Sequence, residues 1–469
     1  MADRLTPLDA SILYLESSET PMHAGNVAIF DEPAGGFDYD ALVALVADRI
    51  TLVPRYRQKV RPVFGRLARP LWVDDADFDL TYHVRRSALP RPGADEQLRE
   101  LVARVLSRPL DRDRPLWEMY LVEGLAGGRF AVLSKTHHAI VDEITAVDIG
   151  QVILDDTPEP RLTSTAEPWR PQPGPGPLDL FADAVAEVVR HPNTVVDQVR
   201  TGLTGLEHAA QRVIGNVGGL AEAARAAVRP APPGPLNVPI GSQRRFETVD
   251  APLERYRRIR TAQGGTVNDV VLATLAGALR GWMMTRGEAV RTDSSMRALV
   301  PVSVQAPPTG NDVAVVGNQV ASYLLDLPIG EPNPIVRLQR ISYGMRAHAD
   351  TGRAVSARAL VELAGFAPST LHALGARVAS RMSRRLFNLI VTNVPGPQVP
   401  LYAAGARLSA SYPVVPLTPG QAVAVGVTSY DGTVHYGLYG DRDAMPDLAV
   451  LSQCITDALD ELLEASASR

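Results

Sequence analysis

The sequence predicts a mixed α/β protein built from two domains, and three observations lead to this prediction. The chain has 469 residues, which is enough for two separate cores and a connector. Two proline-rich segments interrupt it, at residues 158–177, where seven prolines occur, and at residues 230–239, which contain PAPPGP. Strand and helix patterns occur on both sides, so we place domains at residues 1–157 and 246–469 and a proline-rich and helical connector at 158–245.

Composition excludes several classes of function. The formal net charge is -5 and no basic stripe is present, so nucleic acid is not an expected partner. Cys454 is the single cysteine, which rules out an intrachain disulfide and fits a cytoplasmic protein, and we expect its thiol to pack in the core. No secretory signal opens the chain, and no run of about eighteen uncharged apolar residues occurs, so any membrane contact is expected to be peripheral.

Periodicity predicts the elements of the first half and of the connector. Apolar residues recur at helical spacing in three segments of the first domain. A turn at residues 124–128 separates two apolar runs that predict a strand pair. The predicted helices are residues 5–16, 37–50 and 96–106, and the predicted strands are residues 26–31, 119–123 and 129–136. One or two long helices are predicted within residues 178–227, which are rich in Ala, Val and Leu.

The second half repeats this mixture of elements. Asn268 is the expected cap of a helix that continues through Trp282, and Asp431-Gly432 predicts a hairpin turn. A rigid turn is expected at residues 393–397, Asn-Val-Pro-Gly-Pro. The other predicted strands are residues 297–304, 317–325, 386–392, 422–430 and 434–439, and the other predicted helices are residues 335–348, 360–379 and a final helix after Pro446.

Residues 131–150, AVLSKTHHAIVDEITAVDIG, predict a strand, a turn and a helix. His137 and His138 fall at the strand end and Asp142 falls in the turn. Consecutive strand residues point to opposite faces, so one imidazole is able to face a cavity as a general base while the other supports the backbone. The alternative is that both histidines are structural. A metal site with Asp142 is not expected, because the two imidazoles diverge, and the chain contains no GxSxG, P-loop, HExxH or paired CxxC motif.

The stretch resembles the HHxxxDG motif of the coenzyme A-dependent acyltransferase superfamily. Within it, the chain is similar to the bacterial wax ester synthase/acyl-CoA:diacylglycerol acyltransferase family over nearly its full length. One position departs from the motif, because Glu143 stands where the family has Gly. The resemblance is carried by HHAIVDE together with LTPLDASILYLES, PMHAGNVAIF, DRPLWEMYLVEGL, NDVVLATLAGALR, PVSV, GNQVASYLLDLP and NVPGPQVPLY.

The resemblance implies two chloramphenicol-acetyltransferase-like domains side by side around a central tunnel. It implies that His138 is the general base, that His137 supports the strand end, and that Asp142 is structural and paired with an arginine, for which Arg297 and Arg245 are candidates. Further residues match family blocks near the tunnel and are candidate substrate-binding residues, with helix capping and turn geometry as the alternative interpretation. These candidates are Glu143, Asn268, Asp269, Asn318 and Asn393.

The resemblance further implies an O-acyltransferase that moves a long acyl chain from acyl-CoA to diacylglycerol or to a long-chain alcohol, without an acyl-enzyme intermediate. Acyl-CoA is then a co-substrate, no permanently bound cofactor or metal is expected, and apolar substrates favour a peripheral location at the inner face of the membrane or at lipid droplets. A basic cluster, Arg55, Arg57, Lys59 and Arg61, is either a solvated face or a contact for the phosphates of coenzyme A.

Glu143 leaves three outcomes open. The turn tolerates it, or its charge raises the pKa of His138, or its bulk narrows the coenzyme A entrance. Two alternatives to the leading function therefore remain: an acyltransferase of the same fold with another acceptor, and an acyl-CoA- or lipid-binding protein with weakened turnover.

Overall fold

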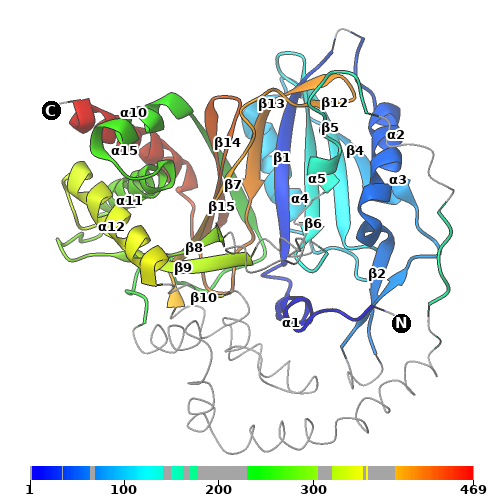
Figure 1. The fold of residues 1–469 in the computed structure, drawn as a ribbon, viewed down its shortest axis with the longest axis horizontal. Helices are drawn as coiled ribbons and strands as arrows, with labels where there is room; N and C mark the ends of the chain where they lie inside the picture. Colours follow the sequence, from blue (N-terminus) through cyan, green and yellow to red (C-terminus); the bar gives the residue numbers. More distant parts are fainter. Residues whose placement is uncertain are drawn as a thin grey trace, which may run out of the picture.

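The protein, seen here in a computed structural model, contains two large β-sheets that lie side by side (Figure 1). Most helices cover the outer sides, and α4 (Asp95–Leu106) packs between the first sheet and strand β7 (Arg244–Pro252) of the second. The two-domain mixed α/β fold is therefore as predicted. The predicted helices at 178–227 and 360–379 lie outside the described residues. The structure describes residues 3–33, 35–63, 69–140, 149–161, 169–174, 176, 230–304, 319–351, 355–356 and 386–467.

The first sheet has six strands in the order β12-β13-β1-β6-β5-β4. Strand β6 is central, and it runs antiparallel to β1 and to β5, as the predicted strand pair requires. Strand β4 closes the edge by pairing parallel with β5. The bounds are β1 His23–Asp31, β4 Val84–Ala88, β5 Trp117–Leu125, β6 Arg129–His137, β12 Tyr402–Ala403 and β13 Ala406–Val414.

The three helices predicted at residues 5–16, 37–50 and 96–106 agree with α1, α2 and α4 to within two residues at each end. Thr6 accepts a hydrogen bond at the start of α1 and Asp38 does so at the start of α2, and both are preferred capping residues. The helices are α1 Pro7–Leu15, α2 Tyr39–Arg49, α3 Leu80–His83, α4 Asp95–Leu106 and α5 Ile149–Val152. Two 3-10 turns, Ile50–Leu52 and Pro54–Arg57, lead into a small separate sheet made of β2 Gln58–Arg61 and β3 Leu71–Asp74.

The second sheet has seven strands in the order β10-β9-β8-β11-β14-β15-β7. The predicted hairpin is confirmed, because Asp431 and Gly432 join β14 to β15 with φ of 42° and 82°, which suits a turn with two left-handed residues. The bounds are β7 Arg244–Pro252, β8 Met296–Val304, β9 Gln319–Leu327, β10 Val355–Ser356, β11 Leu389–Pro395, β14 Val423–Tyr430 and β15 Thr433–Asp441.

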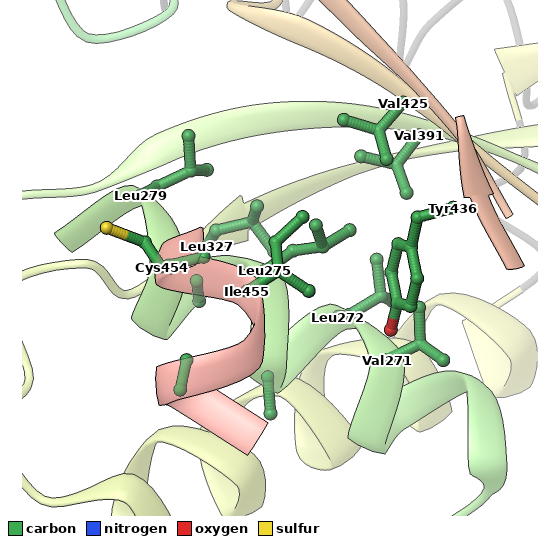
Figure 2. Close-up of a cluster of buried hydrophobic side chains, with 14 of the residues drawn as sticks. Val271, Leu272, Leu275, Leu279, Leu327, Val391, Val425, Tyr436, Cys454 and Ile455 are labelled. Atoms are coloured by element: carbon green, nitrogen blue, oxygen red, sulfur yellow. The ribbon is translucent and has the colours of Figure 1, made fainter. Parts of the chain in front are cut away.

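The main core of the second half lies between this sheet and helices α10 Leu253–Gln263, α11 Val267–Thr285, α12 Pro334–Thr351 and α15 Leu448–Ala467. Figure 2 shows how α11 presents Leu272, Leu275 and Leu279 toward Ile455 of α15. Spacing of three and four residues places such side chains on one helix face, which is why this helix was predictable. The thiol of Cys454 packs in the same cluster, as expected, and burial raises its pKa.

The two sheets meet through a segment that the sequence analysis missed. Strands β12 and β13 fall within the predicted domain 246–469, but they pair with β1 in the first sheet. Gly426 and Gly437 are cross-strand partners on β14 and β15, and a Cβ on Gly426 would lie 2.7 Å from the carbonyl oxygen of Pro413. Glycine at these positions therefore lets β13 lie closely against the second sheet.

Two local predictions in the second half were wrong. Thr266, not Asn268, is the N-cap of α11, and Asn268 is the second residue of the helix. The predicted turn at 393–397 begins later than expected, because Asn393, Val394 and Pro395 continue strand β11 and pair parallel with β14. Pro395 is tolerated because it ends the strand.

Candidate active site

His137 is the last residue of β6, and its imidazole is fully buried. Its Nδ1 accepts a hydrogen bond of 3.1 Å from the backbone N–H of Ala139, which places the proton of the neutral ring on Nε2. Burial, the neighbouring His138 and the charge of Arg112 lower the pKa of His137 to about 3. The ring is therefore neutral at physiological pH, and its Nδ1 lone pair is occupied by the turn.

His138 follows at the first residue of the turn, and the structure places its imidazole differently. Its backbone N–H donates to the carbonyl of Met22 at 3.0 Å, so the backbone is fixed by the segment that leads into β1. Its side chain is exposed, and among the described residues no partner for either ring nitrogen is found. The two adjacent rings thus have opposite environments, as the alternation along a strand predicts.

The exposed ring of His138 nevertheless has a lowered pKa. Desolvation lowers its pKa below the ordinary value of 6.5, although the side chain is exposed. Together the two observations describe an imidazole that is accessible from outside and neutral at physiological pH. A neutral imidazole with unused nitrogen atoms in an accessible position has the properties of a general base.

A buried carboxylate lies behind the histidine pair. Glu16, directly after α1, accepts from the Met22 N–H through Oε1 at 3.2 Å and from Arg112 Nη2 through Oε2 at 2.6 Å. His137 Nε2 is 3.8 Å from Glu16 Oε2, too far for a hydrogen bond. The sequence analysis did not single out Glu16, although it lies within the family block LTPLDASILYLES.

A second group of buried polar residues surrounds the C-terminal end of α4. His23 is the cross-strand partner of His137, and its Nε2 lies 2.7 Å from the carbonyl oxygen of Leu106. The Lys135 ammonium donates to the carbonyl oxygen of Arg108 at 2.6 Å. Desolvation and then the Lys135 charge hold the pKa of His23 well below its ordinary value. Both side chains therefore satisfy helix-end carbonyls beside the histidine strand.

The candidate residues of the second half also lie together. The Asn393 side-chain amide donates to Asn268 Oδ1 at 2.9 Å and so joins β11 to the start of α11. Asp269 Oδ2 accepts from the Thr266 N–H at 2.8 Å and from the Ser342 hydroxyl at 2.9 Å. These bonds fit the alternative interpretation of Asp269, which is helix capping.

Three predicted site residues, Asp142, Glu143 and Asn318, lie outside the described residues. Of the two candidate partners for Asp142, Arg297 donates to Asp326 at 2.7 Å and Arg245 donates to the carbonyl oxygen of Arg442 at 3.2 Å. The lowered pKa of His138 is opposite in direction to the effect that a nearby carboxylate would have.

The basic cluster is engaged by neighbouring side chains. Arg55 pairs with Asp3 at 2.5 Å and Lys59 pairs with Asp75 at 2.8 Å. The guanidinium of Arg57 lies 4.7 Å from the ring centre of Trp169, a residue of the first proline-rich segment. Arg55, Arg57 and Lys59 are thus partly buried against protein groups rather than fully solvated, and a contact of the cluster with the phosphates of coenzyme A stays a prediction.

The part of the chain that the structure describes contains no set of three or more His, Cys, Asp or Glu side chains arranged to hold a metal ion. Within the same part, every helix is too short or too polar to span a bilayer.

Comparisons with known proteins identify the family of the chain. Residues 5–271 match the model of the wax ester synthase/diacylglycerol acyltransferase catalytic domain, and residues 316–463 match that of the WS/DGAT C-terminal domain. The chain is 33% identical over 466 residues, 99% of each chain, to "Probable diacyglycerol O-acyltransferase tgs2" of Mycobacterium tuberculosis. It is 44% identical over 261 residues to "Probable diacyglycerol O-acyltransferase tgs3" of the same organism, which covers 55% of this chain and 96% of that one.

Solved structures show the same fold. The wax ester synthase/diacylglycerol acyltransferase from Marinobacter aquaeolei VT8 superposes with a TM-score of 0.69 at 29% identity, over 99% of this chain and 100% of that chain. The first condensation domain of the CDA synthetase has a TM-score of 0.60 at 15% identity, over 100% and 97% of the two chains, and shares the fold. The matched domains, the full-length relatives and the HHxxxD stretch at the end of β6 together show that the chain belongs to the wax ester synthase/diacylglycerol acyltransferase family and is an acyltransferase.

Proposed function

We propose that the protein transfers a long acyl chain from acyl-CoA to the hydroxyl group of diacylglycerol, with His138 as the general base. The observation that carries the proposal is the environment of His138, whose imidazole is exposed and neutral and whose backbone is hydrogen-bonded to Met22. The names of the mycobacterial relatives support diacylglycerol as the acceptor, and acyl-CoA as the donor follows from the family.

The reaction needs few parts. One ring nitrogen of His138 takes the proton of the acceptor hydroxyl as its oxygen attacks the thioester carbonyl carbon. The tetrahedral intermediate collapses, the carbon–sulfur bond breaks, and the imidazolium returns the proton to the leaving thiolate. The products are an ester and free coenzyme A. A thioester is already activated, so no acyl-enzyme intermediate is needed, and His137 and Asp142 serve in the proposal as supports of the turn.

A long-chain alcohol is the second candidate acceptor. It is favoured by the likeness to the Marinobacter enzyme, whose name includes wax ester synthase. Both acceptors are apolar, so we propose that the protein acts peripherally at a membrane or lipid-droplet surface. Both also present a single hydroxyl, so His138 would serve either reaction in the same way.

Release of coenzyme A tests the proposal. Palmitoyl-CoA is supplied with dioleoylglycerol in phospholipid vesicles or with hexadecanol, and free thiol and ester product are both measured, together with the fraction of protein that sediments with the vesicles. We expect acceptor-dependent release, and a loss of about 10²- to 10⁴-fold in kcat for His138→Ala. Because the described residues offer the His138 ring no hydrogen bond, we expect the melting temperature of this variant to stay close to that of the wild type.

The contrary results have distinct meanings. Equal turnover by the wild type and by His138→Ala would show that His138 is not the base. Silence of both proteins with both acceptors would direct attention to Glu143→Gly. Restored turnover in that variant would show that the motif is obstructed by Glu143, whereas continued silence with retained acyl-CoA binding would support the binding-protein alternative.

A further inference from the structure

The backbone of Met22 forms hydrogen bonds to two groups near the histidine pair. Its carbonyl oxygen accepts the His138 N–H at 3.0 Å, and its own N–H donates to Glu16 Oε1 at 3.2 Å. A single residue therefore connects the Glu16 carboxylate with the backbone of His138. Any displacement of the carboxylate is passed to the hydrogen bond that holds His138.

Arg112 fixes the other oxygen of this carboxylate. Its Nε and Nη2 lie 3.1 Å and 2.6 Å from Glu16 Oε2, and Nη2 also donates to the carbonyl oxygen of Leu13 at 2.9 Å. The side chain of Glu16 is 5% exposed, whereas that of Arg112 is 49% exposed. A buried carboxylate with two charge-assisted bonds is a stiff support, because moving it would leave a charge unpaired in a poorly hydrated place.

Arg112 also lies close in sequence to Leu116, the residue that holds the backbone of His137. The segment from Arg112 leads into Leu116, whose carbonyl oxygen accepts the His137 N–H at 3.0 Å. The Glu16–Arg112 pair thus links the end of α1, the residue that holds His138 and the segment that holds His137. It acts through backbone bonds, since Glu16 makes no hydrogen bond to the His137 ring.

We propose that Glu16 and Arg112 are positioning residues for acyl transfer, which set the place of the His138 imidazole through Met22. This inference rests on the proposed role of His138 as the base. It predicts an effect on the chemical step rather than on acyl-CoA binding, because the Glu16 carboxylate is buried and acts on His138 through the backbone of Met22. A displacement of about 1 Å at a reacting group lowers the rate by about 100-fold.

The test measures kcat and KM for palmitoyl-CoA in full-length variants. Glu16→Ala is expected to lower kcat by about 100-fold with KM changed by less than about threefold, and Glu16→Gln, which keeps the acceptor for Met22, by about tenfold. Arg112→Met should resemble Glu16→Gln. Glu19→Ala is the matched control, because that exposed carboxylate in the same segment bonds the Ser18 hydroxyl, and we expect wild-type kinetics.

A double variant separates positioning from general damage to the fold. If Glu16 acts through His138, then Glu16→Ala has no further effect on the residual rate of His138→Ala. An equal loss in both backgrounds would overturn the inference, as would a kcat for Glu16→Ala within about twofold of the wild type. If Glu16→Ala does not fold, Glu16→Gln and Arg112→Met are read by the same criteria. Failure of the proposed function gives a different result, in which His138→Ala itself keeps full activity.

Discussion

The two sheets of the molecule differ in the side chains that they bury. Among the described residues, the first sheet buries a row of polar groups on β1, β5 and β6: His23, Glu118, Ser134, Lys135, Thr136 and His137. The second sheet and its helices enclose an extended apolar cluster, part of which appears in Figure 2, and its buried polar groups are spread over β7, β9 and β15: Arg244, Ser322, His435 and Asp441. Buried polar groups need partners and restrict the arrangements of a core, so this difference places the most constrained region of the protein around the histidine strand.

The start of α11 and the end of β6 also differ in how their polar side chains are hydrogen-bonded. At the start of α11, the Asp269 carboxylate and the Asn268 and Asn393 amides bond to one another or to neighbouring protein groups. At the end of β6, the ring of His138 has no hydrogen-bond partner among the described residues, and the His137 Nε2 is buried without one. Unused polar groups are costly in a folded protein, and their presence beside a rigid backbone is typical of a site that meets a substrate.

The largest effect that tests this contrast is expected at Lys135. Lys135→Met removes the bonds to the carbonyl oxygens of Val105 and Arg108 and the 3.5 Å contact with Glu118, so we expect the free energy of unfolding to fall by about 3 kcal/mol. Arg86→Met is the control, because Arg86 pairs with Glu123 while both side chains are partly exposed, and we expect a much smaller loss. Urea denaturation measures both values. Equal losses would show that the buried polar groups of the first sheet contribute no more to stability than an exposed ion pair.

A smaller effect is expected at the second sheet. Asp269→Ala should lower the free energy of unfolding by about 1–2 kcal/mol, because the Thr266 N–H and the Ser342 hydroxyl lose their acceptor. Asp293→Ala, at an exposed position, should change it by less than about 0.5 kcal/mol. Thermal unfolding and kcat are measured together. If kcat falls when it is measured at a temperature well below the melting temperature of the variant, Asp269 belongs to the substrate site instead, as the family resemblance implies.

The smallest effect concerns pH. A general base works when it is unprotonated, and desolvation lowers the pKa of His138 below 6.5, so the acid limb of the kcat/KM profile should have its midpoint below pH 6.5. A pH–rate profile of wild type and of Glu143→Gly measures the position of this acid limb. A wild-type midpoint above 6.5 that moves down in the variant would show that the Glu143 carboxylate, rather than burial, governs His138.

Local patterns in the sequence determined much of the fold. The apolar spacing of α2, α4, α11 and α15, the hairpin at Asp431-Gly432 and the strand that ends in His137 were all predictable. Each depends on residues within a few positions of one another, where side-chain periodicity and turn geometry act directly. The opposite environments of His137 and His138 followed from the same alternation.

Tertiary structure decided the features that join distant segments. Strand β13 adds to the first sheet, Arg112 reaches Glu16 across 96 residues, and Asn393 bonds to Asn268 across 125. None of these pairings leaves a periodic signal in the chain, because each partner is locally compatible with several neighbours and packing selects one. The sequence by itself therefore placed two adjacent histidines at the end of a strand, and the family resemblance singled out His138 as the candidate base. Only the tertiary structure brought Glu16, Met22 and Arg112 beside this pair, because they come from segments that are distant along the chain.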